Sequence, residues 1–204
     1  MSKVFLVGAS QEARTVANLL MDANPLVDIE VLADRGYGEI GTTFHGLRII
    51  GFTEALGEMP VTGQLVFTNP DPVQRAAALT PVLNARQEKR VWPIKSVKAP
   101  TAVIASSAKI GVGSIVMPGA VIMDGAELGS HVMIGAGVIV GAEARVCDFA
   151  TLQAGVVLGA KAYVGKGGLC GLAAVVSANR RVGAWSQVLD GFHLRKDLAP
   201  GKTT

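Results

Sequence analysis

The second half of the chain repeats an apolar residue at every sixth position. The position two residues before it is usually small, as at Ala102, Ser114 and Ala174. Self-similarity at a short fixed period is the signature of repeat architectures. The pattern therefore predicts a repeat fold from about Ala102 to Leu194. The apolar series consists of Ile104, Ile110, Val116, Ile122, Leu128, Ile134, Val140, Val146, Leu152, Leu158, Val164, Cys170, Val176, Val182, Val188 and Leu194.

Three hexapeptides of this kind make one triangular coil of about 18 residues. Each side of the triangle is a short strand, and strands of successive coils stack in parallel, about 4.8 Å apart. Glycine often follows the inward aliphatic residue, as at Gly141, where it suits a corner that needs positive φ or close backbone approach. The predicted fold is therefore a parallel β-helix. Its last coil is expected to be frayed or capped, because Arg180 takes a small-residue position and Phe192 follows.

The first half of the chain alternates strand-like and helix-like segments. This alternation predicts a small parallel α/β sheet with helices on its faces. We expect the domains to be residues 1–97 and 98–204, with a proline-punctuated linker at 94–100. The predicted strands are 3–7, 28–32, 47–50 and 64–67, and the predicted helices run from about 11 to 21 and from about 69 to 86.

The turn Gly8-Ala9-Ser10 joins the first strand to the first helix. Parallel sheets bind phosphates at such turns, although an ordinary tight turn has the same composition.

Composition narrows the class of protein. Half of the residues are apolar, 17% are charged and the formal net charge is +3, which is typical of a globular domain. The sequence has no basic stripe with interleaved aromatic residues, so it does not predict nucleic-acid binding. No apolar run approaches the roughly 18 residues of a membrane span. Cys147 and Cys170 fall within the repeat and have no metal-ligand spacing. We therefore expect no metal site. The N-terminus lacks the apolar run of a signal peptide, so we expect a cytoplasmic protein.

Several short stretches, in order and with the repeat, resemble one enzyme family. The sequence is similar to the sialic-acid O-acetyltransferase and bacillosamine N-acetyltransferase group, which are acetyl-CoA-dependent sugar acyltransferases of bacterial surface-glycan pathways. The likeness extends from Lys3 to about Gly201. The stretches that carry it are Val7–Ser10, Gly46–Gly51, Ala99–Ile104 and Lys196–Gly201.

The resemblance implies a Rossmann-like N-terminal domain that holds a nucleotide sugar, and a left-handed β-helix that forms homotrimers with acetyl-CoA between subunits. In that family a histidine accepts a proton from the attacking amine or hydroxyl, an acidic neighbour orients the histidine, and a backbone amide faces the thioester oxygen. The residues implied for the sugar nucleotide are Gly8, Ala9, Ser10 and Arg14, and those implied for the coenzyme are Gly159, Ala160, Ala178 and Gly191.

The catalytic positions depart from the family pattern. Ala142 stands where the family has its catalytic histidine, Thr151 where it has a second histidine, and Gln11-Glu12 where it has Gly-His; only the acidic Glu143 remains. Loss of the base should slow the reaction by about 10²- to 10⁴-fold.

Two other residues could supply the base. Glu143 would be a weak one, because an ordinary glutamate pKa is about 4.3. His131 lies on another side of the triangle and could reach the site only from a neighbouring subunit; otherwise it is an exposed corner residue. His45 falls in a first-domain loop and His193 in the last coil.

Three functions are therefore compatible with the sequence. The first is an acyltransferase for an amino or hydroxyl group of a nucleotide sugar, with Glu143 and His131 as catalytic candidates and the amides near Gly159 and Ala160 facing the thioester. The second is a catalytically silent relative that serves as a binding or scaffold protein. The third is an enzyme of the same fold with a different acyl donor or acceptor, whose changed pocket uses a nucleophile that is already neutral and needs less base catalysis.

Overall fold

The chain forms two compact units, Met1–Lys95 and Ser96–Thr204, in a computed structural model that describes residues 3–34, 36, 38–59, 61–87 and 91–204. The structure divides the chain after Lys95, two residues before the expected division after residue 97. The difference arises because Val97–Lys98 forms strand β6, which pairs with β9 (Ile115–Val116) of the second unit.

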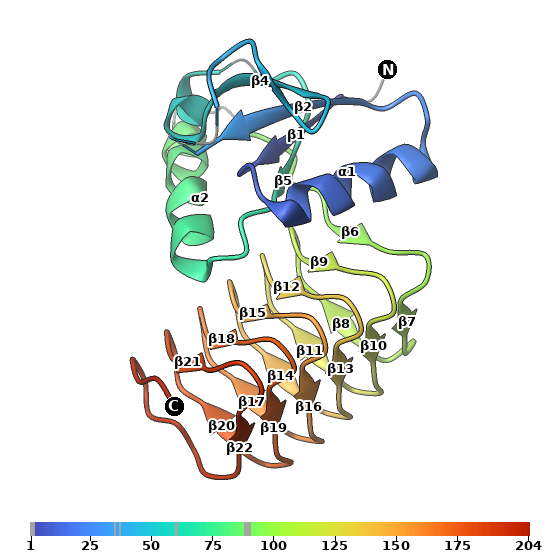
Figure 1. The fold of residues 1–204 in the computed structure, drawn as a ribbon, viewed down its shortest axis with the longest axis vertical. Coiled ribbons are helices and arrows are strands. Elements are labelled where there is room, and N and C mark those ends of the chain that lie inside the picture. The colour runs from blue at the N-terminus through green and yellow to red at the C-terminus, as the bar shows by residue number, and fades with distance from the viewer. Residues whose placement is uncertain (1–2, 35, 37, 60, 88–90) are drawn as a thin grey trace. The chain divides into compact units, whose positions relative to one another are not determined.

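The first unit is built around one five-stranded sheet (Figure 1). Its strand order is β3-β4-β2-β1-β5; the last four strands are parallel, and β3 pairs antiparallel with β4. The predicted α/β alternation is confirmed, whereas β3 and the 3₁₀ segment η1 were not predicted. The elements are β1 (Lys3–Val7), α1 (Gln11–Ala23), β2 (Asp28–Ala33), β3 (Thr43–Phe44), β4 (Leu47–Phe52), η1 (Thr53–Glu58), β5 (Gln64–Phe67) and α2 (Pro72–Gln87).

Burial explains why these segments fold as they do. In β1 the four residues from Val4 to Val7 are all buried, as expected for a parallel strand that is covered on both faces. Part of the expected linker also belongs to this unit, because Ile94 pairs in parallel with Leu65 of β5. Just before the linker, the Trp92 ring packs edge-on against Phe5.

The second unit consists of three parallel sheets of two-residue strands (Figure 1). Sheet I contains β7 (Val103–Ile104), β10 (Val121–Ile122), β13 (Ile139–Val140), β16 (Val157–Leu158), β19 (Val175–Val176) and β22 (His193–Leu194). Sheet II contains β8 (Lys109–Ile110), β11 (Glu127–Leu128), β14 (Arg145–Val146), β17 (Tyr163–Val164) and β20 (Arg181–Val182). Sheet III contains β6, β9, β12 (Met133–Ile134), β15 (Thr151–Leu152), β18 (Leu169–Cys170) and β21 (Gln187–Val188).

The six-residue rhythm has the predicted geometry. Within each sheet a strand pairs with its equivalent one coil further along the chain, so that Ile110, Leu128 and Val146 lie in register. In the strands from β9 to β22 the second residue points into the column, and from Val116 to Leu194 these residues are at most 5% exposed. The arrangement fits the predicted left-handed β-helix.

The column extends further at both ends than the pattern indicated. In β6 Val97 is buried and Lys98 is exposed, the reverse of the later strands, so a search for inward aliphatic residues at every sixth position does not find this strand. At the other end Val182 pairs with Leu198, which arrives before a full coil is complete and packs against the core. The final coil is therefore a shortened cap, and Arg180 turns outward to pair with Asp197.

The glycines of the column have two different roles. Glycine directly after an inward residue allows close approach: a Cβ on Gly141 would lie 2.6 Å from the Leu158 oxygen and 2.7 Å from the Ala160 nitrogen. Positive φ occurs two positions later, at glycines such as Gly137 but also at Glu143. Close approach is thus the reason for the first set, and the left-handed corner position accepts several residue types.

Candidate functional site

Glu143 lies at the corner between sheets I and II, which we call the I–II corner. This corner comprises residues 124–125, 142–143, 160–161 and 178–179, which stack one above another in successive coils. Backbone hydrogen bonds hold the stack: the Glu143 amide donates to the Asp124 carbonyl, and the Lys161 amide donates to the Ala142 carbonyl, both at 2.9 Å. The structure therefore places Glu143 beside Ala142 and one coil away from Ala160.

The Glu143 carboxylate is exposed and paired. Its side chain is 65% exposed, and its Oε2 lies 3.7 Å from the Lys161 Nζ. The structure thus places an acidic group and an ammonium group side by side next to Ala142.

The corner carries backbone amides that are open to a ligand. At two other corners the equivalent amides, of Ser130 and Leu172, donate to an aspartate of the next coil, each at 2.8 Å. At the I–II corner the residues that stand one coil after Ala142 and Ala160 are alanines. Among the residues that the structure describes, none accepts a hydrogen bond from the Ala160 amide. An exposed amide of this kind is a suitable donor to a developing oxyanion.

The four residues expected near the coenzyme are only partly brought together. Gly159, Ala160 and Ala178 meet at the I–II corner, where Gly159 has no room for a Cβ against the Ala178 backbone. The Gly159 amide already donates to the Val176 carbonyl at 2.8 Å, so Gly159 has no free donor. Gly191 lies at the corner between sheets III and I, away from the other three within one chain.

His131 is at a different corner from Glu143. It follows β11 and precedes β12, so it lies between sheets II and III. The expectation of an exposed corner residue is wrong in one respect: His131 is only 5% exposed, and its ring stacks on Phe149 at 5.2 Å between centroids. One chain does not bring His131 to Glu143, and Thr151 is buried in sheet III.

His193 is a polar group that the sequence interpretation left in the last coil. It occupies the outward position of β22, where its Nε2 lies 2.9 Å from the Ser177 Oγ. Arg195 Nε donates to His193 Nδ1 at 3.2 Å, so the ring proton belongs on Nε2 and is donated to Ser177. Both ring nitrogens of His193 thus lie within hydrogen-bond distance of a neighbouring side chain. The sequence signal for this placement is the repeat itself, because His193 stands one coil after Val175 and therefore in the same outward row of sheet I.

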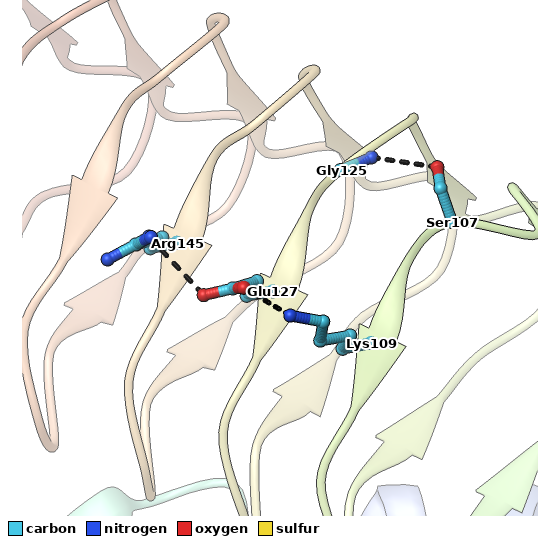
Figure 2. Close-up of polar contacts among 5 residues, drawn as sticks. All are labelled: Ser107, Lys109, Gly125, Glu127 and Arg145. Carbon is cyan, nitrogen blue, oxygen red and sulfur yellow. Dashed lines mark hydrogen bonds and ion pairs between the residues drawn. The ribbon is translucent and has the colours of Figure 1, made fainter.

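The outer face of sheet II carries a ladder of charged side chains. Glu127 lies between Lys109, whose Nζ is 2.9 Å from Oε1, and Arg145, whose Nε is 3.3 Å from Oε2 (Figure 2). The hydrogen bond from Lys109, with the positive charges of Lys109 and Arg145, lowers the pKa of Glu127. Further along, the Arg181 guanidinium lies 4.0 Å above the Tyr163 ring.

The predicted turn of the first unit is locked by its own hydrogen bonds. Gly8 has a φ of +102°, and a Cβ there would lie 3.1 Å from the Asn69 nitrogen. Ser10 caps α1 by accepting from the Ala13 amide at 3.2 Å, and its hydroxyl donates to the Thr68 carbonyl at 2.9 Å. Ala9 is buried, and Arg14 is exposed on α1. The turn thus has a structural role that does not depend on a ligand.

A cleft of about 410 Å³ lies close to this turn, at the carboxyl ends of β2 and β4. Asp34 and Thr53 are among its lining residues, and the Asp34 carboxylate accepts from Thr53 Oγ1 at 3.2 Å and from Asn69 Nδ2 at 3.1 Å. In open parallel sheets, ligands bind beyond the carboxyl ends of the strands. The sequence interpretation missed Asp34 and Asn69, which mark that edge.

The described part of the chain contains no group of three or more His, Cys, Asp or Glu side chains arranged to hold a metal ion. Within the same residues, none of the helices has the length and apolar character that crossing a bilayer requires.

Comparison with known proteins gives a clear result for structure alone. No family model matches the chain, and no curated protein matches its sequence. A histidine-to-asparagine variant of perosamine N-acetyltransferase from Caulobacter crescentus, in complex with CoA and GDP-perosamine, is similar with a TM-score of 0.84 and 21% identity, over 100% of this chain and 92% of that one.

Two further structures are similar over nearly the full length. The acetyltransferase domain of PglB from Neisseria gonorrhoeae, in complex with acetyl coenzyme A, has a TM-score of 0.85 and 23% identity over 98% of this chain and 94% of that one. WeeI from Acinetobacter baumannii has a TM-score of 0.77 and 16% identity over 100% and 96%. These likenesses establish the fold.

Proposed function

We propose that the protein is an acetyl-CoA-dependent acyltransferase that modifies an amino group of a nucleotide-linked sugar in surface-glycan biosynthesis. The observation that carries this proposal is the likeness of fold over the whole chain, both units included, to two sugar-modifying or acetyl-transferring proteins whose structures hold CoA or acetyl-CoA. The open Ala160 amide gives the corner a donor for the thioester oxygen.

Each unit has its own part in this proposal. The Rossmann-like first unit holds the nucleotide sugar near Gly8–Ser10, with Arg14 exposed on α1 as a cation for its phosphates. The I–II corner holds the thioester against the Ala160 and Ala178 amides. Gly159 contributes by letting the next coil approach closely, because its own amide is used.

An amino group is a better acceptor for this site than a hydroxyl group. A neutral amine attacks with its own lone pair and loses its proton afterwards, whereas a hydroxyl needs a base during attack. The corner offers Ala142 and a paired Glu143 in place of a strong base. The attack forms the C–N bond and breaks the C–S bond of the thioester, so that coenzyme A leaves as its thiolate. Glu143 orients the amine and receives its proton, with His131 of a neighbouring subunit as a second candidate.

A homotrimer completes the proposal. The outward residues of sheet I form an aliphatic row, in which Val103 is 64% exposed and Ile139 is 38% exposed. The other three residues of the row are half-buried, and a partly exposed apolar row of this kind is typical of an interaction surface. Packing of this face against a second copy would put residues of that copy, Gly191 among them, beside the I–II corner. The row consists of Val103, Val121, Ile139, Val157 and Val175.

One observation favours a second function, that of a catalytically silent binding or scaffold protein. Ala142 cannot take a proton, Glu143 is paired with Lys161, and Thr151 is buried. A protein that lost its catalytic base during evolution while keeping its fold would have residues of this kind at these positions.

Mass spectrometry separates the two functions. The full chain is incubated with acetyl-CoA and nucleotide-linked amino sugars, beside the Ala142→His variant and the matched Ala154→His variant, which places a histidine at the equivalent position of another corner. We expect acetylated sugar from the wild type and a rate about 10²- to 10⁴-fold higher from Ala142→His only. Product from Ala142→His alone supports the silent protein, and no product from any of the three contradicts the acyltransferase.

A further inference from the structure

Each strand of sheet I gives two backbone amides to the next coil. The donors are the outward residue of the strand and the residue that follows the inward one. In β19 the amides of Val175 and Ser177 donate to carbonyls of the next coil at 2.9 and 3.0 Å, and every earlier strand of this sheet does the same. In β22, which is in register with β19, the equivalent donors are the amides of His193 and Arg195.

The segment that follows β22, residues 195–204, caps the last strand of sheet II. The Arg181 amide of β20 donates to the Asp197 carboxylate at 3.1 Å. The Gly183 amide, the second donor of the same strand, donates to the Leu198 carbonyl at 2.8 Å. One carboxylate and one backbone carbonyl thus take the place of a further coil.

Sheet III is capped by the same segment. The Gln187 amide of β21 donates to the Lys202 carbonyl at 2.8 Å. The Leu189 amide donates to the Thr204 hydroxyl at 3.1 Å. In two of the three sheets, therefore, both donors of the last strand have an acceptor.

The last strand of sheet I differs from the other two. β22 lies at the end of its sheet (Figure 1). Within the described ranges of the chain, no group accepts a hydrogen bond from the His193 amide or the Arg195 amide. This edge presents its two donors with the spacing at which each earlier strand of the sheet pairs with its successor. An edge of this kind is a template for an extended segment of another chain.

The side chains beside this edge are cationic. Arg195 and Lys196 follow β22 directly and are exposed, and neither forms an ion pair with a carboxylate that the structure describes. The sequence from 190 to 204 contains two carboxylates, Asp190 and Asp197, which already accept backbone amides at 2.8 and 3.1 Å. An acidic segment is therefore complementary to this edge, because it would supply carboxylates to unpaired cations.

A second copy of the chain is less complementary to the same edge. Pairing of two β22 edges would bring the Arg195 and Lys196 side chains of both copies together, and like charges at an interface repel. Cationic side chains beside a sheet edge are a common protection against such self-association. Charge therefore favours an acidic partner over a second copy.

We propose that the amide edge of β22 binds an extended acidic segment of a partner protein, which adds to sheet I as its next strand. The His193 and Arg195 amides donate to carbonyls of the segment, and the Arg195 and Lys196 side chains pair with its carboxylates. Aliphatic side chains alternate with the acidic ones, so that one of them lies in register with the inward Leu194. This binding is independent of acyl transfer.

Fluorescence polarisation with the full chain tests the match of charge. The probe is a labelled, end-blocked heptapeptide of alternating glutamate and isoleucine, and its counterpart carries lysine in place of glutamate. We expect only the glutamate peptide to bind. Arg195→Gln and Lys196→Gln should each raise its Kd about threefold, as loss of an exposed ion pair does. The matched control is Lys202→Gln, which removes the same charge next to the sheet III cap and should leave the Kd unchanged.

Hydrogen–deuterium exchange tests whether the backbone edge is the site. In the free protein the His193 and Arg195 amides should exchange rapidly, whereas the capped amides of Arg181 and Gln187 should be protected. With the glutamate peptide at ten times its Kd, exchange at His193 and Arg195 should slow about tenfold, because about nine in ten molecules are then occupied. Exchange at Arg181 and Gln187 should not change.

The outcomes separate the proposal from its alternatives. Binding of the glutamate peptide alone, with protection of the His193 and Arg195 amides and weakening by Arg195→Gln and Lys196→Gln only, supports the proposal. Equal weakening by Lys202→Gln indicates general charge attraction and overturns it. Protection of the two amides in the free protein that grows with its concentration identifies a second copy as the occupant and also overturns it, as does a failure of the glutamate peptide to bind. No outcome depends on whether a sugar is acetylated.

Discussion

The two kinds of glycine in the β-helix should respond very differently to the same substitution. Gly137→Ala adds a methyl group where no atom lies within 4 Å, at a φ of +66°. Its cost is the strain of a left-handed alanine, about 1 kcal/mol. Gly141→Ala adds the same methyl group 2.6 Å from the Leu158 oxygen, well inside the 3.4 Å at which ordinary contact begins. The next coil would have to move away.

That movement also stretches the hydrogen bond from the Gly141 amide to the Leu158 carbonyl, which is 2.9 Å long. Overpacking with a strained backbone should cost about 3 kcal/mol. For a chain of this size 1 kcal/mol shifts Tm by about 2–4 °C, so we expect losses of about 3 °C for Gly137→Ala and about 9 °C for Gly141→Ala. Thermal unfolding followed by circular dichroism measures both. Equal losses, or a larger loss for Gly137→Ala, would refute the assignment of close approach to Gly141.

Three other measurements follow from named contacts. Burial raises the pKa of Cys170 to about 12, while Cys147 is half-buried, so a thiol reagent should modify only Cys147 in the folded protein and both cysteines in urea; modification of Cys170 in the folded protein would contradict its place in the core. Ile139→Glu should convert the proposed trimer into 21.1 kDa monomers in light scattering, and an unchanged mass would exclude sheet I as the contact face. Because the pKa of Glu127 is lowered, its ion pairs stabilise the fold above the ordinary value of 4.5 and are lost as the pH falls through the lowered pKa; Glu127→Gln should flatten this limb of a Tm–pH profile, and an identical limb would show that the pairs contribute nothing.

The column was predictable because one physical requirement recurs at a fixed interval. Every inward position must fill the same narrow prism, so Leu128 and Val146 obey the same constraint and the period is visible. The ends were not predictable in this way. In β6 the buried residue is Val97 and not the following Lys98, and the final coil closes early, on Leu198. Both ends depart from the period that defines the interior.

The candidate site was less accessible to sequence reasoning than the fold. The sequence predicted that Glu143 and Ala160 belong to neighbouring coils of one corner, because register fixes which residues stack there, and the structure has them so; their role in catalysis stays a prediction. It could not show that the Gly159 amide is used and the Ala160 amide is open, since that depends on the direction of each N–H. It also missed the contact of Arg181 with Tyr163, which belong to successive coils and share no motif.

The strict registration of strands in successive coils has a consequence for how such a chain can change in length. Excising one full turn of the column would reconnect every later strand to a partner of its own sheet, so Arg181 would still follow the row of Lys109 and Glu127. Excising a single hexapeptide would preserve the hydrophobic interior equally well, yet it would transfer each later side chain to the neighbouring side of the prism. The column can therefore gain or lose whole turns during evolution, and the outward side chains of the remaining turns then stay on the same sides of the prism.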